Sequence, residues 1–395
     1  MLKEMSGSLR SLPRRSWLGL VLAFVAIFII FLWHLGNLTP GLSRQEVEYA
    51  SSSHSWALII SNPINAPHKI VQLVVFNLSP QHPSLLRLAS VSFALIFCLG
   101  FYRLATGWFG RAIGLFSTLI FACLPLLVVS GRQASAEIMF FCPVIFISLY
   151  NWLLRAKQYQ SVAWFTLCLA AAVFVFTPGL LIWLVAGFCI CRKNIIKSIS
   201  AVPVQVSFFG LLLIFSSVAS LALVSIKHHY IAKQLFLIPA YLGNGLTPVK
   251  HIGWMFLSLF VKTGQTDPLI VQRLPLLSVL SIALFIFGLY AMLTAAKSKA
   301  IWLGLSIVYA ILAAGLNNKV SILALGLPAI ILFVAAGLRY LYIEWRSVFP
   351  RNPVPKSFAF VLIAIVALVQ LYFGLRYSLA AWPEAPATRA AYVLK

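Results

Sequence analysis

Long apolar runs recur from one end of the chain to the other, and they limit what this sequence can fold into. Hydrophobic residues make up 62% of the 395 positions and charged residues only 9%. A helix needs roughly 20 apolar residues to cross a bilayer, so each run is a candidate span. The runs are 17–35, 85–104, 113–130, 135–154, 162–176, 178–190, 204–226, 274–296, 300–316, 320–342 and 357–375. We therefore expect an all-α polytopic membrane protein with about 11 transmembrane helices in a single membrane domain, 1–395.

Two of these runs need a decision about their ends. The run 17–35 follows basic residues and resembles a signal peptide, but it is longer than the apolar core of one and no small-residue cleavage site follows it. We interpret it as a retained first helix. The stretch 161–190 is interrupted by Thr177-Pro178-Gly179, and Arg155 and Arg192 flank it. Because both flanks then belong on the cytoplasmic side, we expect a hairpin of two helices.

The formal charge of +23 is better explained by the membrane than by nucleic acid. Lys and Arg are denser in the short connections that lie inside when the N-terminus is inside, as the positive-inside rule requires. No soluble module carries a basic face with interleaved aromatic residues, so we expect no nucleic-acid partner. The pattern predicts an integral protein of the cytoplasmic (plasma) membrane that contacts anionic lipids, with its N-terminus inside and its C-terminus outside.

Two outer segments are much longer than the other connections, which indicates a functional site on the outer face. The first, 36–84, is the predicted catalytic loop. It contains Ser43-x-x-Glu46, a capping box that predicts a helix start, and a second helix is expected from about Asn65. The second, 227–273, is expected to cover a lipid phosphate or an acceptor. Its apolar stretch 252–261 is too short to span, so we expect an interfacial helix.

Several kinds of chemistry are excluded by missing motifs. The chain has only one Asp, so no DxD sugar-nucleotide motif exists, and P-loop, HExxH and GxSxG motifs are absent. The six cysteines form no CxxC pair and lie in or beside apolar runs, which disfavours a disulfide scaffold or a zinc site. We predict no metal site and no cofactor, and we leave assistance by a divalent ion as an open alternative.

The carboxylate most suited to chemistry is Glu46, with Glu48 as its substitute. These residues are two positions apart, so on a helix they point in different directions and cannot form a facing acid–base couple. A lone carboxylate with a pKa raised by apolar surroundings can still act as a general base. Cations on the same face would hold a leaving phosphate. The candidate cations are Arg44, Lys69, Arg132, Lys250, Lys262 and Arg273.

Each of these residues also has a simpler interpretation. On this interpretation, Glu46 serves only as the cap of its helix. Glu48 suits a solvated position. Arg132 and Glu137 open the fourth run and form, on this interpretation, a local pair of little energetic value. The loop lysines would contact lipid headgroups.

The order of short motifs over about 36–155 resembles a known family. In order, they are an acidic residue before Tyr49, then Pro67–Lys69, Ser84–Ser90, Phe101–Leu104, Trp108–Arg111 and Ser130–Ala134. This series is similar to the C-type integral-membrane glycosyltransferases (GT-C), the group that contains protein O-mannosyltransferases and 4-amino-arabinose lipid A transferases.

The resemblance implies a multi-helix fold, a polyprenyl-phosphate sugar donor and an inverting transfer at a site between the outer loops. The acid of the family's first outer loop, often an Asp-Glu pair, falls on Gln45-Glu46, so Gln45 replaces the Asp. The leading hypothesis is a membrane glycosyltransferase that passes a sugar to a cell-envelope acceptor, which is a glycan, a lipid or a protein. Glu46 would be the base and Arg132 with the loop lysines would hold the phosphate.

Two other functions stay open. The missing Asp favours a catalytically inactive relative that binds lipid-linked sugar or scaffolds an envelope complex. A transporter is the third hypothesis. It is disfavoured because transporters carry ionisable residues or paired broken helices inside the bilayer, whereas the interior of nearly every run here is uncharged.

Overall fold

An apolar chain in lipid must satisfy its backbone polar groups internally, and this chain does so with helices. The computed structural model describes residues 16–394 except 37–38, 40, 79–82, 157, 240–244, 265–266 and 349–352. Within that part of the chain, the β-structure consists of one isolated bridge, between Leu42 and Leu394. The fold is therefore all-α, as the sequence predicts.

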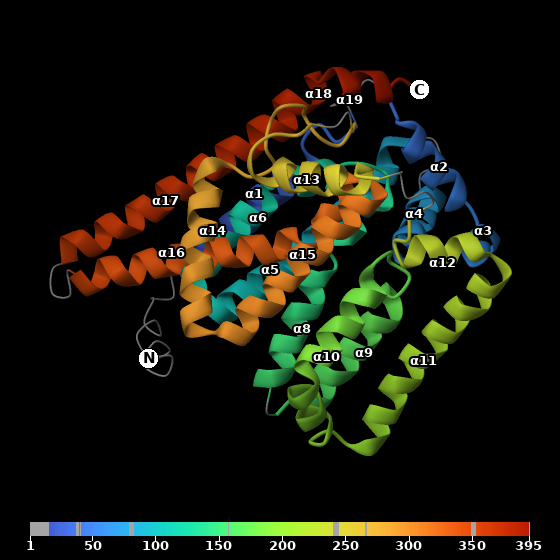
Figure 1. Ribbon diagram of the computed structural model, residues 1–395, viewed down its shortest axis with the longest axis horizontal. Helices are drawn as coiled ribbons and strands as arrows, with labels where there is room; N and C mark the ends of the chain where they lie inside the picture. Colours follow the sequence, from blue (N-terminus) through green and yellow to red (C-terminus); the bar gives the residue numbers. More distant parts are fainter. Residues whose placement is uncertain are drawn as a thin grey trace.

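The helices follow one another with short connections (Figure 1). The first half contains α1 (Ser16–Leu32), α2 (Arg44–Ser52), α3 (Trp56–Ser61), α4 (Ala66–Leu78), η2 (Pro83–Arg87), α5 (Leu88–Phe109), α6 (Arg111–Ala122), α7 (Pro125–Gly131), η3 (Ala136–Phe141), α8 (Pro143–Arg155), α9 (Gln160–Phe174) and α10 (Leu180–Ile199). The second half contains α11 (Val204–Lys227), α12 (His229–Leu235), α13 (Thr247–Phe260), α14 (Val279–Ala295), α15 (Lys297–Asn317), η4 (Val320–Leu325), α16 (Leu327–Val348), α17 (Pro353–Leu375), η5 (Arg376–Ala381), α18 (Trp382–Glu384) and α19 (Pro386–Ala391).

Fewer helices than expected meet the requirements of a membrane span. In the described residues, six are long and apolar enough to cross a membrane. A seventh arises if α6 and α7, which are bent by 62° at a short break before Pro125, count as one span. Apolar helices at 19–32, 160–174 and 279–295 are shorter. The structure thus supports six or seven spans by length and composition, and the count of eleven stays a prediction.

The two long segments fold into short helices at one end of the bundle. Segment 36–84 forms α2, α3, α4 and η2, and segment 227–273 forms α12 and α13. In Figure 1, α2, α13, α18 and α19 lie along one edge of the molecule. The predicted break at 177–179 separates α9 from α10, and Gly179 adopts a positive φ of 76°, which glycine tolerates without strain.

Helices α14 and α16 pack backbone to backbone. A Cβ placed on Gly288 would lie 1.7 Å from the carbonyl oxygen of Phe333, and one on Gly337 would lie 2.1 Å from that of Leu284. Small residues permit this approach, which is a common way to associate helices in lipid because burial adds little there. The contact fixes α16, which follows η4 and therefore helps to place the site described next.

Candidate active site

Two adjoining hollows lie where the short helices cover the bundle, and we refer to them together as the polar cleft. They measure about 620 and 350 Å³ and share a wall made of Glu137, Asn318, Lys319 and Ser321. Polar side chains that line only the larger hollow are Tyr49, Asn65, Tyr230, Lys233, Gln234, Thr247, His251 and Asn317. The smaller hollow adds Gln45 and Asp267. The cleft therefore joins residues from α2, η3, α12, α13, η4 and the loop after α13.

Glu137 is the carboxylate at the centre of the polar cleft. It stands in η3, is 8% exposed, and its Oε2 has no hydrogen-bond partner in the described part of the chain. The charges of Asp267 and Lys319 both act on it. A buried carboxylate oxygen without a partner is costly unless a ligand completes it. Glu137 is thus the group in the cleft best placed to accept a proton or a hydrogen bond from a bound molecule.

Asp267, the only Asp of the chain, supplies a second carboxylate. Its Oδ1 accepts a hydrogen bond of 2.9 Å from the backbone N–H of Leu269. Burial raises the pKa of this carboxyl group, while the N–H groups of Leu269 and Val320 and the nearby Lys319 oppose that rise. Asp267 and Glu137 line the same hollow, and the charge of Asp267 acts on Glu137.

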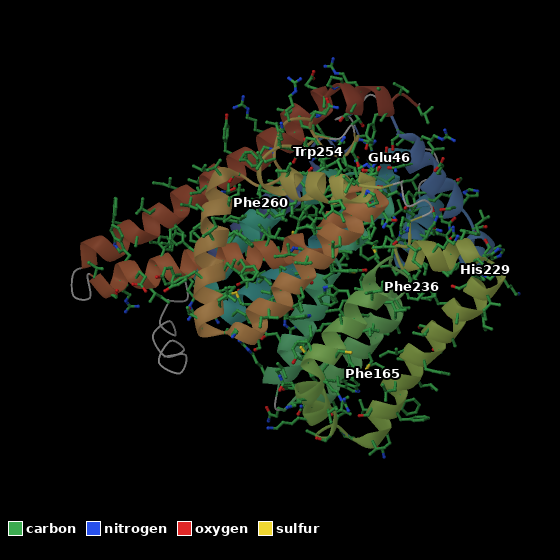
Figure 2. All side chains as sticks on the ribbon, in the orientation of Figure 1. Glu46, Phe165, His229, Phe236, Trp254 and Phe260 are labelled. Carbon is green, nitrogen blue, oxygen red and sulfur yellow. The ribbon has the colours of Figure 1, made fainter. Side chains whose placement is uncertain are left out.

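Glu46, labelled in Figure 2, is fully buried, and its carboxylate does not line the cleft as a catalytic base would. Oε2 accepts the N–H of Ser43 at 2.9 Å, completing the predicted capping box, and Oε1 accepts the N–H of Ala134 at 2.8 Å. Arg87 adds a bidentate ion pair, with Nε 2.9 Å from Oε1 and Nη2 3.2 Å from Oε2. Both oxygens are occupied, so Glu46 acts by holding the backbone three residues before Glu137.

The same backbone is held from α4. Gln72 donates from Nε2 to the carbonyl of Ala134 at 2.5 Å and accepts from the hydroxyl of Ser53 at 3.0 Å. Ser90 donates to the carbonyl of Ser135 at 3.1 Å. Helix α4 turns its polar side inward and exposes Ile70 and Val74, the reverse of an ordinary amphipathic helix in water. Its buried polar side chains therefore fix the loop that aims Glu137 into the cleft.

Gln45, the chain neighbour of Glu46, lines the cleft, whereas Glu46 does not. Glu48 points away, in an exposed ion pair of 3.1 Å with Arg44. Such a pair contributes at most about 1 kcal/mol. The site residues predicted in the first loop, Glu46, Glu48, Arg44 and Lys69, are thus absent from the cleft lining, and Glu48 and Arg44 are exposed.

The other predicted phosphate ligands also lie outside the cleft lining. Arg132 is buried and donates to the carbonyls of Ile30, at 2.6 Å, and Trp33, where it caps the end of α1. Burial lowers its pKa to about 10, with a smaller effect of Arg87. Lys69 donates to the carbonyl of Asn62 at 2.8 Å, and burial lowers its pKa to about 8. Lys250, Lys262 and Arg273 are exposed.

Sequence reasoning did not assign to a site the three charged residues that line the smaller hollow. Glu137 was interpreted as a local partner of Arg132, but the ion pairs among described residues do not join the two. Asp267 and Lys319 were not assigned. One signal was present, since Asp267 is the chain's only Asp and lies in an outer segment. The sequence around Lys319 gave no such signal. This residue lies two positions after a helix, and only the tertiary structure places it at the cleft.

The C-terminal segment ties the two sides of the cleft together. Trp382 donates from its indole Nε1 to the carbonyl of Pro268 at 2.7 Å, and Val271 donates its N–H to the Tyr377 hydroxyl at 2.8 Å. The bridge between Leu394 and Leu42, with N···O distances of 2.6 and 3.2 Å, reaches the start of α2. The segment thereby fixes the Asp267 loop relative to Gln45.

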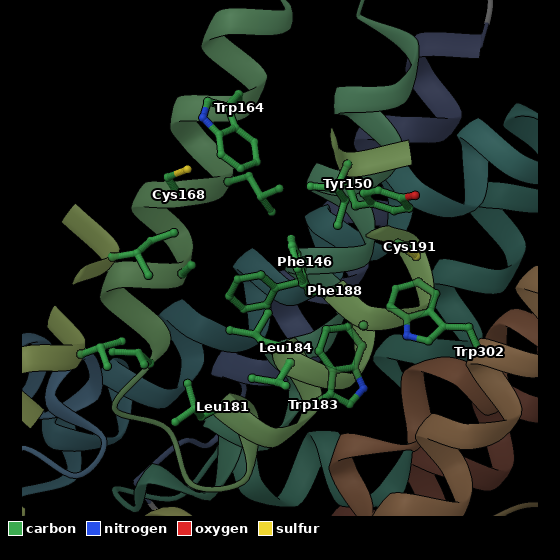
Figure 3. Close-up of a pocket in the computed structure, with 18 residues that line it drawn as sticks. Phe146, Tyr150, Trp164, Cys168, Leu181, Trp183, Leu184, Phe188, Cys191 and Trp302 are labelled. Atoms are coloured by element: carbon green, nitrogen blue, oxygen red, sulfur yellow. The ribbon is translucent and has the colours of Figure 1, made fainter. Parts of the chain in front are cut away.

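An apolar cavity of about 310 Å³ lies beside the cleft, between α8, α9, α10, α11 and α15 (Figure 3). Aliphatic and aromatic side chains line it, the aromatic ones including Phe146, Trp164, Trp183 and Trp302. The α9–α10 connection separates it from the cleft, because Pro178 lines the cleft while Val175 and Leu181 line the cavity. The polar cleft suits a headgroup, and the neighbouring apolar cavity suits a hydrocarbon chain.

Metal ligands are sparse in the cleft. Among the described residues, no group of three or more His, Cys, Asp and Glu side chains is placed to hold a metal ion. The cleft offers two carboxylates, Glu137 and Asp267, which is fewer than the three or four protein ligands of a zinc site.

Comparison with known proteins identifies the fold. No protein-family model matches the chain, and no curated protein matches it in sequence. Solved structures do match. ArnT from Cupriavidus metallidurans in the apo state aligns with a TM-score of 0.61 at 15% identity, over 93% of this chain and 78% of ArnT. The same protein bound to undecaprenyl phosphate gives 0.54 at 16% identity, over 94% and 78%.

The archaeal oligosaccharyltransferase AglB from Archaeoglobus fulgidus, in complex with an inhibitory peptide and a dolichol-phosphate, aligns with a TM-score of 0.56 at 14% identity. The alignment covers 94% of this chain but 56% of AglB, so this chain spans little more than half of that protein. The chain therefore shares the fold of these two membrane proteins. The resemblance inferred from the sequence is thereby confirmed at the level of the fold.

Proposed function

We propose that this protein is an integral-membrane glycosyltransferase that moves a sugar from a polyprenyl-phosphate carrier to a hydroxyl-bearing acceptor in the polar cleft. One observation carries the proposal: a buried carboxylate, Glu137, presents an unpartnered oxygen to a cleft that also contains Lys319. The shared fold supports the donor class, because the solved relatives were captured with undecaprenyl phosphate and dolichol-phosphate.

The chemistry needs a base and a cation on opposite sides of the reacting carbon. Glu137 takes the proton of the acceptor hydroxyl while that oxygen attacks the anomeric carbon. The bond from this carbon to the phosphate oxygen breaks, and its electron pair leaves with the carrier phosphate. Lys319 and Lys233, which line the cleft, neutralise the charge that develops there. Attack from the face opposite the phosphate inverts the anomeric centre.

The carrier's hydrocarbon chain would occupy the apolar cavity of Figure 3. The cavity and the cleft lie on either side of the α9–α10 connection, so the carrier would pass this connection with its hydrocarbon chain in the cavity and its phosphate in the cleft. We further propose the topology predicted from the sequence, with the cleft on the outer face of the plasma membrane, the N-terminus inside and the C-terminus outside. The eleven-span arrangement with outer loops 36–84 and 227–273 belongs to this proposal.

The test compares Glu137→Gln with Glu48→Gln at equal expression in liposomes. The measurement is release of polyprenyl phosphate from a polyprenyl-phosphate sugar in the presence of envelope glycolipids. We expect Glu137→Gln to lower turnover by about 10²–10⁴-fold, the usual effect of losing a general base, with donor binding retained. Glu48→Gln, on the exposed pair, should match the wild type. Undiminished turnover in Glu137→Gln would remove this residue from the mechanism.

One observation favours the second function, a non-catalytic relative that binds lipid-linked sugar. Gln45 lines the cleft at the position where the family's Asp is expected, and an amide cannot accept a proton at neutral pH. The same assay separates the two proposals. Saturable donor binding by the wild-type protein, without carrier release on any acceptor offered, would favour the binding protein over the enzyme.

A further inference from the structure

A second cluster of charged side chains lies at the far end of α5, around Trp108. Arg339 of α16 donates from Nη1 to the carbonyl of Trp108 at 2.6 Å. The ammonium of Lys299, from α15, lies 4.6 Å from the centroid of the Trp108 ring. The indole N–H of Trp108 donates to Oδ1 of Asn151 on α8 at 2.9 Å. Four helices therefore converge on this one tryptophan.

Arg155 completes the cluster from the end of α8. Its Nη1 lies so close to Gly107 that a Cβ on this glycine would approach it to 3.1 Å. Its positive charge also acts on Lys299. Like charges repel at short range, so some attraction must hold them in this arrangement.

The described residues supply no carboxylate to balance these cations. The ion pairs in the described part of the chain join Arg44 to Glu48, Arg87 to Glu46 and Arg389 to Glu384. Glu344, five residues after Arg339 on α16, forms none with it. The Nε of Arg339 is buried without a partner. The C-terminal carbonyls of α5 attract cations, but that effect is about half of one elementary charge.

The position of the cluster indicates which anion it binds. Helix α5 begins beside the Glu46–Arg87 pair and, with 22 residues, extends about 33 Å to its other end. That length equals the thickness of a bilayer core, so the cluster lies at the leaflet opposite the cleft. The side chains of Leu154 and Ile301, which neighbour Arg155 and Lys299 in sequence, are 46% exposed each and would face acyl chains.

We propose that Arg155, Lys299 and Arg339 form a binding site for the phosphate of an anionic phospholipid, with the Trp108 ring at headgroup level. Basic pockets between helices on the cytoplasmic side recognise lipid headgroups in this way, and tryptophan favours the interface. The exposed apolar flanks favour a lipid over a free phosphate ion, which needs no acyl contact. The site does not depend on the sugar-transfer proposal, because it lies at the other end of α5.

The test measures phosphatidylglycerol binding to the purified full-length chain by native mass spectrometry, with phosphatidylcholine as the zwitterionic reference. Lys299→Gln and Arg155→Gln remove exposed cations without opening the core. Each should weaken phosphatidylglycerol binding about five-fold, the effect of one cation near a lipid surface. Lys297→Gln is the matched control, an exposed lysine at the first position of the same helix, and it should bind as the wild type does.

Three outcomes would overturn the proposal. The first is phosphatidylglycerol binding in Lys299→Gln and Arg155→Gln at the wild-type level. The second is displacement of the lipid by inorganic phosphate at equal concentration, which would identify a free-anion site. Equal losses in the Lys297→Gln control would assign the binding to diffuse surface charge and would also overturn the specific site.

Discussion

Arg87 and Glu46 form a buried ion pair that ties the start of α5 to the start of α2, with Nε 2.9 Å from Oε1. Arg87 also donates to the carbonyls of Leu35 and Gly41, at 3.0 and 3.1 Å. The pair therefore joins the segments after α1, around α2 and at α5. Because Glu46 also accepts the N–H of Ala134, the backbone that leads to Glu137 depends on the same carboxylate.

Arg87→Leu is expected to destabilise the fold by about 3–5 kcal/mol, because it leaves the Glu46 charge buried and uncompensated. Thermal unfolding in detergent measures the change. Arg44→Leu is the control, since its exposed pair with Glu48 contributes at most about 1 kcal/mol. Similar losses in both variants would contradict the assignment of the Arg87 pair as a structural tie.

Gly288→Ala should destabilise the contact of α14 with α16 by about 1–3 kcal/mol, because the new methyl group meets the backbone carbonyl of Phe333 and cannot be accommodated by a rotamer change. Gly304→Ala is the matched control in α15. Nothing lies within 4 Å of its added Cβ, so it should be neutral or stabilising by up to about 1 kcal/mol. The unfolding temperatures of both variants, compared with that of the wild type, measure these two effects.

Lys69 predicts a specific pH dependence of stability. Burial lowers its pKa from 10.5 to about 8 in the folded protein. Between these values the unfolded chain binds a proton that the folded chain has lost, so stability rises with pH across this window. Below pH 8 the folded protein carries the full cost of the buried charge. Stability of the wild type relative to Lys69→Met should therefore increase from pH 8 to pH 10.5, and a flat difference would refute the shift.

Trp382→Phe tests whether the C-terminal segment positions the Asp267 loop. The variant loses the indole N–H that binds the carbonyl of Pro268 but keeps an aromatic ring in a buried place. We expect a stability loss of about 1 kcal/mol, the ordinary worth of one hydrogen bond. Hydrogen exchange at the Leu269 and Val271 amides should accelerate. Trp56→Phe, at an exposed position of α3, should leave both amides unchanged.

Local sequence patterns predicted much of the framework. The Ser43–Glu46 capping box is present, α4 begins after Asn65, and the Thr177–Gly179 break separates two helices. Each of these features depends on neighbours within a few residues, where turn and cap chemistry act. The fold resemblance drawn from short motifs also holds. The number of spans was less predictable, because apolar runs at 17–35 and 162–176 form helices shorter than a full span.

The site was less accessible to sequence reasoning for a different reason. Glu46 has a carboxylate that could act as a catalytic base. In the fold, however, that carboxylate binds Arg87 and the N–H of Ala134, which are 41 and 88 positions away in the sequence. Glu137 and Asp267 belong to one cleft only because η3 and the loop after α13 meet beside η4. Whether a carboxylate stabilises the fold or stays free to react depends on which groups donate hydrogen bonds to its oxygens.

The sequence by itself determined that this is a helical membrane protein with polar chemistry confined to a few connecting segments, because hydrocarbon forces an apolar chain to satisfy its backbone within helices. Tertiary structure alone decided which of the scarce acids stays open to a ligand. Packing closed Glu46 into a saturated ion pair and left Oε2 of Glu137 without a partner, and long-range contacts of this kind are not encoded in any local pattern.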